Sequence, residues 1–299
     1  ILQGLKPRLE KFHGVQIDSV AIVKAVDLAT RYMNDKKNPD KSIDLIDGAC
    51  ATERVKDKAG LVVTGDLIDI QVARIANIPE TKVSTDVSDK VLELDSNIKQ
   101  RLFGQDHVID EVLERLYVNY AGISTPNRPM GAFLFLGPTG TGKTEFAKLL
   151  SENLEMHMLR YDMSEYQDRH TVSSLLGAPP GFVGYNDSNL GGGKLISDVS
   201  KHPYSILLFD EIEKAHPDIA NIFLQMMDEG KITGSNGKTV DVKNCVIIMT
   251  SNLGARDNEN NNIGFGQDLT KTGSEDKAVK DYFKPELRNR LDLITKFKS

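Results

Sequence analysis

The segment Ala132–Thr144, AFLFLGPTGTGKT, restricts the possible folds of this 299-residue chain more than any other segment. Its first five residues are apolar and have no helical period, which is typical of a strand buried on both faces. They lead directly into a full match to the pattern G-x-x-x-x-G-K-[ST], and the helix-like segment Glu145–Leu150 follows. Strand, motif and helix in this order argue against a chance match. The sequence therefore predicts a loop that binds the phosphates of a nucleoside triphosphate.

The residues of this loop have separate expected roles. Glycines let the backbone turn its N–H groups toward phosphate oxygens. Lys143 is expected to reach the β and γ phosphates, and the Thr144 hydroxyl can ligate Mg²⁺. The expected nucleotide-binding residues are Gly137, Pro138, Thr139, Gly140, Thr141, Gly142, Lys143 and Thr144.

Polar residues follow two other apolar strand candidates. Asp210 ends the segment that starts at Ser205, and Glu211 comes next. An Asp in this place can hold Mg²⁺ through water, and a neighbouring Glu can orient or deprotonate an attacking water. The alternative is a solvated acidic strand end, which the phosphate-binding motif disfavours. Asn252 follows the strand candidate 246–250, and its amide can position the same water unless it is an ordinary turn residue.

Five segments have the composition of strands, and helical or loop segments separate them: 132–136, 158–162, 205–210, 246–250 and 293–297. Strands that alternate with helices predict an α/β fold with a parallel sheet and helices on both faces. Such a sheet binds its ligand at the carboxyl ends of the strands, where the phosphate-binding loop is expected.

The first 80 residues have helical patterns instead. One helix is expected after Asp18 or Ser19, a second from Asp40 to about Gly60, and a third from about Asp66 to Ile78. The polar segment 81–89 is expected to be a linker. We therefore expect a small all-α domain over residues 1–83 and a larger α/β domain over residues 84–299.

The composition excludes several classes of protein. The chain is 39% hydrophobic and 27% charged, which is typical of a soluble globular protein. A net charge of −6 argues against a general nucleic-acid binder. No apolar stretch reaches membrane-spanning length and no signal peptide is present, so we expect a cytoplasmic protein without a membrane partner. Cys245 lies in an apolar run far from Cys50 and is expected to be a buried free thiol. Both ends of the chain look like cuts through a longer polypeptide.

Two further segments have unusual composition. Pro285–Arg290 carries Arg288 and Arg290 without a neighbouring pair of acids. Arginine is suited to stabilising charge on a γ-phosphoryl group, often from another subunit, although a surface ion pair is the alternative. Phe182 lies among glycines and prolines, so it is expected on a loop. It either packs into the core or projects as a binding contact.

Together these residues resemble the Clp/heat-shock-100 family of AAA+ proteins, most closely its ClpA-type members. The matching signatures are 162–166, 177–181, 210–217 and 285–290. Residues 1–7 and 39–47 are similar to the helical small subdomain that ends the first ATPase module of the family. Residues from 84 onward are similar to the large subdomain of the second module, without the small subdomain and sensor 2 arginine that follow it.

The resemblance implies an ATP- and Mg²⁺-dependent protein unfoldase that forms a homo-hexameric ring. It implies that the ring feeds unfolded or tagged proteins to a ClpP-type peptidase. Lys143 and Thr144 match Walker A, and Asp210 and Glu211 match Walker B. The residues that the resemblance assigns to hydrolysis are Glu211, Asn252 as sensor 1, and Arg290 as an arginine finger that reaches a neighbour.

Two loops complete the resemblance. Gly181, Phe182, Val183 and Gly184 match the pore loop that grips substrate polypeptide. Ile263, Gly264 and Phe265 lie in the polar segment 258–271 and are similar to the tip by which ClpA-type rings hold the peptidase. The alternative for this tip is a local anchor on the core.

Three other functions are weighed against this interpretation. A ClpB-type disaggregase acts without a protease, but its coiled-coil insertion has no room between Leu45 and Leu67. A nucleic-acid motor on the same fold is disfavoured by the acidic balance and by the Phe182 loop. A non-catalytic scaffold is disfavoured by the intact motifs. Residues 186–194 are longer and richer in Gly than the resemblance leads us to expect after a pore loop.

Overall fold

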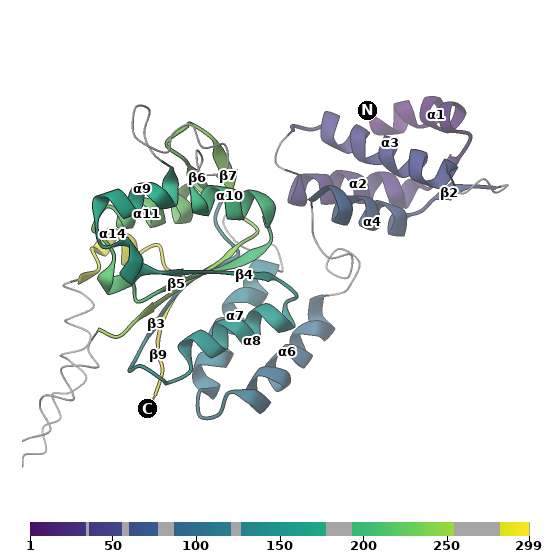
Figure 1. Ribbon diagram of the computed structural model, residues 1–299. Coiled ribbons are helices and arrows are strands. Elements are labelled where there is room, and N and C mark those ends of the chain that lie inside the picture. Colours follow the sequence, from purple (N-terminus) through teal and green to yellow (C-terminus); the bar gives the residue numbers. More distant parts are fainter. Residues whose placement is uncertain are drawn as a thin grey trace, which may run out of the picture. The chain divides into compact units, whose positions relative to one another are not determined.

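The computed structural model describes residues 1–33, 36–55, 60–76, 87–120, 127–177, 193–253 and 282–298. The chain divides into two compact units, Ile1–Asp86 and Val87–Ser299 (Figure 1). Among the described residues, we find no helix with both the length and the apolar character needed to cross a membrane.

The described residues of the first unit form four helices: α1 (Leu2–His13), α2 (Ser19–Tyr32), α3 (Asp40–Arg54) and α4 (Gly65–Ala76). The side chain of Asp18 accepts a hydrogen bond from the N–H of Val20 and so caps α2, as the sequence predicted. Small and branched side chains recur at helical spacing and form one buried core, which includes Ala21, Ala25, Leu45 and Ile46.

The structure corrects three details of the sequence prediction. Strands β1 (Gln16–Ile17) and β2 (Val62–Val63) form a parallel pair in the helical unit, and two residues are too few to give a pattern. Helix α3 ends at Arg54 instead of near Gly60. Residues 81–86 lie outside the described residues, but 87–89 begin helix α6 (Val87–Arg101), so the linker prediction is wrong there. Its first turn is polar, and the buried Leu94 and Ile98 come only later.

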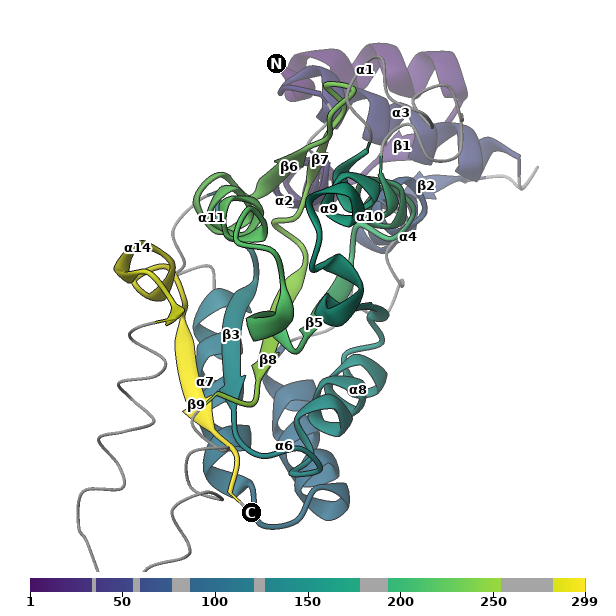
Figure 2. The ribbon, with the colours of Figure 1, turned by 60° about the vertical axis from the view of Figure 1, so that its left-hand side comes forward.

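The second unit contains a five-stranded parallel sheet with the strand order β4–β5–β8–β3–β9. Its strands are β3 (Gly131–Leu136), β4 (His157–Asp162), β5 (Ser205–Asp210), β8 (Val246–Ser251) and β9 (Leu293–Lys296). All five strands were predicted, and Figure 2 shows β9 along the edge beside β3. The predicted α/β fold class is confirmed.

Helices cover both faces of the sheet (Figure 1). One face carries α7 (Asp106–Tyr120) and α8 (Lys143–Asn153), and Phe135 of β3 packs against Phe146 of α8 with ring centroids 5.4 Å apart. The other face carries α9 (Arg169–Leu176), α10 (Lys194–Lys201) and α11 (Ile219–Glu229), which share a core with Leu134 and Leu136. The three central strands β3, β5 and β8 are buried along their whole length, which explains their unbroken apolar sequences.

A short hairpin was not predicted. Strands β6 (Lys231–Thr233) and β7 (Thr239–Asp241) pair antiparallel after α11, and three residues each gave too little alternation to detect. Cys245 lies just before β8 and is buried and free, as predicted.

Two histidines stack beside the amino-terminal end of the edge strand β4. The rings of His157, at the start of β4, and His202, at the end of α10, lie 3.9 Å apart between centroids at an interplanar angle of 16°. Burial lowers the pKa of His202, and the nearby His157 and Lys201 lower it further, while Asp198 opposes them. The folded chain therefore disfavours the protonated form of this imidazole.

The stability of the chain is expected to fall as the pH drops below about 6.5, the ordinary pKa of histidine. Between the lowered folded pKa and this value the unfolded chain binds more protons, so protonation favours unfolding. Thermal unfolding at pH 7.5 and 5.5 measures the effect, on the order of a degree or two in midpoint. His202→Asn should reduce the pH-dependent loss, whereas the exposed control His170→Asn should keep it. An equal loss in both variants contradicts the assignment to His202.

Candidate active site

The predicted phosphate-binding loop joins β3 to α8 at the carboxyl end of β3. Gly137 has φ 142°, and a Cβ there would lie 2.7 Å from the backbone oxygen of Phe297. Gly142 has φ 98°, and a Cβ there would lie 2.8 Å from the side chain of Leu102. Both positions therefore require glycine. Helix α8 begins at Lys143, and a helix N-terminus favours a bound anion.

Lys143 is buried, with 7% of its surface exposed. Its Nζ donates hydrogen bonds to the backbone oxygens of Gly137 at 2.5 Å and Pro138 at 2.7 Å, so the ammonium group folds back into its own loop. Burial lowers the pKa of Lys143, while Asp210 and the other acids of the site act in the opposite direction.

Asn252 connects the loop lysine to the predicted catalytic acid. Its Oδ1 accepts a hydrogen bond from Lys143 Nζ at 3.0 Å, and its Nδ2 donates to Glu211 Oε1 at 3.3 Å. The backbone N–H of Asn252 donates to Glu213 Oε1 at 3.0 Å. The structure thus brings three predicted residues, Lys143, Asn252 and Glu211, into one hydrogen-bonded cluster.

Glu211 lies in an unusual backbone conformation. Its φ of 57° and ψ of 53° are left-handed, which costs energy for a residue with a side chain. Its N–H donates to the Thr250 hydroxyl at 3.1 Å. The short helix η2 (Ile212–Lys214) follows directly, and Lys214 Nζ donates to Glu211 Oε2 at 2.5 Å.

Asp210 is also fully engaged by donors from neighbouring strands. The hydroxyl of Thr250 donates to its Oδ1, and Arg160 Nη2 donates to its Oδ2 at 2.6 Å. No group of three or more His, Cys, Asp or Glu residues that could hold a metal is found in the described part of the chain. One carboxylate and the Thr144 hydroxyl nevertheless suit Mg²⁺, which keeps several waters and takes its other ligands from phosphates. The residues present fit that ion.

Arg290 has an acidic partner that the sequence did not indicate. Its Nε forms an ion pair with Asp228 at the end of α11, and its Nη1 donates to the Glu286 backbone oxygen at 3.1 Å. Asp228 is 62 residues away in the sequence, which is why no local acid was visible. Arg290 follows α14 (Pro285–Arg288) and bonds to Asp228 rather than to the cluster around Asn252.

Sequence reasoning missed several residues of the site. Gln105, in the turn between α6 and α7, donates to the Thr141 backbone oxygen at 3.3 Å and to the Lys298 backbone oxygen at 2.7 Å, so it ties the loop to the end of β9. Thr250, Arg160 and Lys214 also contact predicted site residues. Their only sequence signal was position: two lie on strands beside the motif strands, and one lies three residues after Glu211.

Two loops were predicted to contact other proteins, one the substrate polypeptide and the other the peptidase. The pore loop 181–184, most of the Gly-rich stretch 186–194 and the docking tip 263–265 lie outside the described residues.

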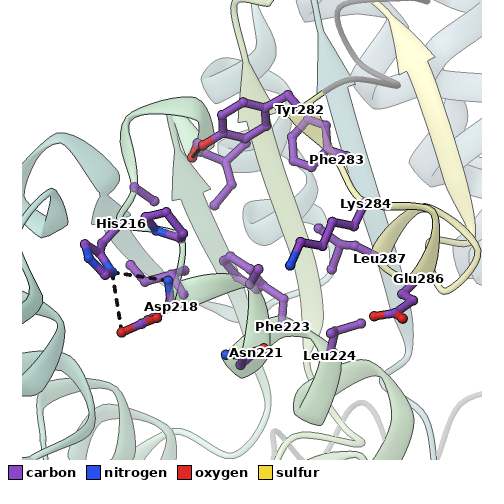
Figure 3. A pocket seen from close by; sticks show the side chains of 15 residues that line it. His216, Asp218, Asn221, Phe223, Leu224, Tyr282, Phe283, Lys284, Glu286 and Leu287 are labelled. Atoms are coloured by element: carbon purple, nitrogen blue, oxygen red, sulfur yellow. Dashed lines mark hydrogen bonds and ion pairs between the residues drawn. The ribbon is translucent and has the colours of Figure 1, made fainter.

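A hollow of about 290 Å³ lies behind η2, between the start of α11 and α14. Figure 3 shows Tyr282 and Phe283 on one side of it and His216 and Asp218 on another. The Tyr282 hydroxyl donates to the Ile212 backbone oxygen at 3.2 Å and so links η2 to the segment before α14.

Comparison with known families identifies the larger unit. A family model described as an AAA domain (Cdc48 subfamily) matches residues 128–294, which is more than half of the chain. The chain belongs to the AAA family. A second model, an AAA lid domain, matches residues 1–98. The phosphate-binding loop and the acidic strand end therefore lie in an AAA ATPase domain.

Relatives place this AAA protein in the Clp/heat-shock-100 group. The chain is 47% identical over 299 residues to a ClpA homolog protein of Fuscovulum blasticum, covering 99% of the chain and 37% of the relative. It is 37% identical over 368 residues to ClpC/MecB of Bacillus subtilis, and the match covers 100% of the chain and 45% of the relative. It is 48% identical over 239 residues to the chaperone protein ClpB of Clostridium tetani, and the match covers 79% of the chain and 27% of the relative. The chain thus spans less than half the length of these relatives.

A solved structure has the same fold. The S. cerevisiae Hsp104:casein complex in its extended conformation matches with a TM-score of 0.82 and 39% sequence identity. The match covers 100% of this AAA chain and 51% of the Hsp104 chain.

Proposed function

We propose that this chain is part of an ATP-driven protein unfoldase that feeds unfolded polypeptide to a ClpP-type peptidase. The observation that carries the proposal is the cluster of Lys143, Asn252 and Glu211 at the carboxyl ends of parallel strands. A cation for phosphate, an amide and a carboxylate base in contact are the parts that hydrolysis of a nucleoside triphosphate requires.

Each side chain has a defined role in this proposal. Lys143 leaves the carbonyl groups of its own loop and neutralises the β and γ phosphates of ATP. Glu211 accepts a proton from the attacking water, and Asn252 orients that water. Thr144, and Asp210 through water, would hold Mg²⁺, which supplies charge neutralisation at the phosphates.

We propose that the chain is a subunit of a ring, as the resemblance to the Clp/heat-shock-100 family implies. Rings with identical head-to-tail interfaces place each site at a subunit boundary. We propose a homo-hexamer in which Arg290 leaves Asp228 and reaches the neighbouring ATP. Unit Ile1–Asp86 then ends a first AAA+ module, and the larger unit is the large subdomain of a second.

Phe182 is proposed to grip the substrate polypeptide, together with Gly181, Val183 and Gly184 beside it. Ile263, Gly264 and Phe265 are proposed to insert into pockets of the peptidase ring. Unfolded or tagged proteins are the proposed substrates, and the cytoplasm is the proposed compartment.

The principal alternative is a ClpB-like disaggregase. It is favoured by the 48% identity to the C. tetani ClpB and by the likeness to Hsp104. One observation supports the peptidase-linked function instead. In the described helical unit, only residues 55–61 separate α3 from β2.

The double variant Ile263→Ser/Phe265→Ser distinguishes the two functions. Loss of both apolar contacts is expected to weaken binding of a ClpP-type peptidase at least about ten-fold, because several weak contacts on one ring act together. ATP hydrolysis and unfolding of a tagged substrate should persist. Co-sedimentation with the peptidase measures binding, and Leu269→Ser in the same segment is the control. Peptidase binding that does not change, or that is absent in the wild type, supports the disaggregase.

A further inference from the structure

Both carboxylate oxygens of Glu211 are occupied by donors from its own subunit. Asn252 Nδ2 donates to Oε1 at 3.3 Å, and Lys214 Nζ donates to Oε2 at 2.5 Å. A carboxylate that acts as a general base must direct a lone pair at the attacking water, and a donor on each oxygen fixes the orientation of this carboxylate. The Lys214 contact is the shorter of the two and carries a full positive charge.

Local backbone geometry builds this contact. The left-handed conformation of Glu211 starts the turn of η2, and the N–H of Lys214 donates to the Glu211 backbone oxygen at 2.9 Å. This turn brings the two side chains together three residues apart. Strain of this kind at a functional residue persists only where its surroundings hold it.

The acids around Lys214 favour its charged form. The pKa of Lys214 is raised, first by its hydrogen bond to Glu211 and then by the charges of Glu211, Asp162 and Glu213. About one third of each side chain is exposed, so solvent screens the pair and it can open. A contact of this strength suits a reversible restraint better than a permanent anchor.

We propose that Lys214 is a positioning residue that restrains Glu211 and limits ATP hydrolysis until the pair opens. This inference rests on the proposed hydrolysis at this site and adds a regulator to it. Opening the pair lets the carboxylate turn so that Oε2 accepts the proton of the attacking water.

The hollow behind η2 gives the turn room to move. Ile212 and Ala215, on either side of Lys214 in the sequence, both line the 290 Å³ space. Close-packed interiors resist displacement, whereas an element beside a void can shift without displacing its neighbours. The link from Tyr282 to Ile212 also connects such a shift to the segment before α14.

Steady-state ATP hydrolysis by the assembled protein tests the restraint. Lys214→Met should raise kcat about five-fold, a modest change because solvent screens this partly exposed ion pair, with KM little changed. Lys214→Arg keeps the charge and should stay near the wild type. Lys231→Met removes a lysine from an exposed pair with Glu229 outside the site and should change nothing. A kcat for Lys214→Met that is unchanged or lower overturns the proposal.

A second measurement needs no hydrolysis. Titration of the Lys214 side chain by NMR in the nucleotide-free chain should show its raised pKa return toward the ordinary value in Glu211→Gln. The same titration in a Glu229→Gln control should not change. If the pKa of Lys214 is the same in Glu211→Gln as in the wild type, the proposed restraint is overturned. This outcome does not depend on whether the wild type hydrolyses ATP. Absent hydrolysis in the wild type would by itself contradict the proposed function.

Discussion

Glu211→Gln is expected to slow ATP turnover at least about a hundred-fold while ATP binding stays close to the wild-type value. Removing a general base costs typically 10² to 10⁴ in rate. The amide keeps the size of the side chain and an oxygen that accepts from Asn252, so the loop around Lys143 should stay intact. Turnover by phosphate release and binding by fluorescent-nucleotide titration measure the two effects separately.

Lys143→Ala is expected to differ from Glu211→Gln in its effect on ATP binding. It removes the ammonium group that meets the phosphates, so tight ATP binding should be lost along with hydrolysis. Lys148→Ala, on the exposed side of the same helix α8, is the matched control and should bind and hydrolyse normally. Equal losses of binding in Glu211→Gln and Lys143→Ala would contradict the division of roles.

Much of the site was predictable because parallel strands fix relative positions. Leu136 lies opposite Ser251, so the loop that starts at Gly137 and the next residue on β8, Asn252, reach the same edge of the sheet. Phe209 lies opposite Met249, which brings Asp210 level with Thr250. Apolar runs that end in a polar residue were therefore sufficient to indicate Lys143, Asp210, Glu211 and Asn252.

Contacts that depend on backbone strain or on distant residues were not predictable in this way. The pairing of Lys214 with Glu211 follows from the left-handed backbone conformation of Glu211. A glutamate rarely adopts this conformation, so its presence in the sequence does not predict the turn. The partner of Arg290 lies on α11, and no local pattern connects it to α14. The strands β1, β2, β6 and β7 have two or three residues each, too few for periodicity to distinguish them from loops.

The ion pair of Arg290 with Asp228 leaves two possible roles for this arginine. A guanidinium that stays paired with Asp228 is a surface ion pair, which contributes little to stability and nothing to catalysis. One that serves a neighbour must exchange Asp228 for a phosphate, a stronger charge-assisted partner. These alternatives differ in what Arg290→Ala does to turnover.

Arg290→Ala is expected to reduce ATP turnover at least about a thousand-fold, as for arginine fingers that stabilise the transition state. The neighbouring Arg288, which donates to the Phe283 backbone oxygen at 3.1 Å, is the control, and Arg288→Ala should lose far less. Mixing Arg290→Ala subunits with Lys143→Ala subunits then decides between action within a subunit and action across a boundary. At a mixed boundary, the Lys143→Ala subunit supplies Arg290 to a neighbour whose Lys143 is intact, so part of the activity returns. Two inactive variants that stay inactive in rings shown to be mixed would mean that Arg290 does not act across the boundary.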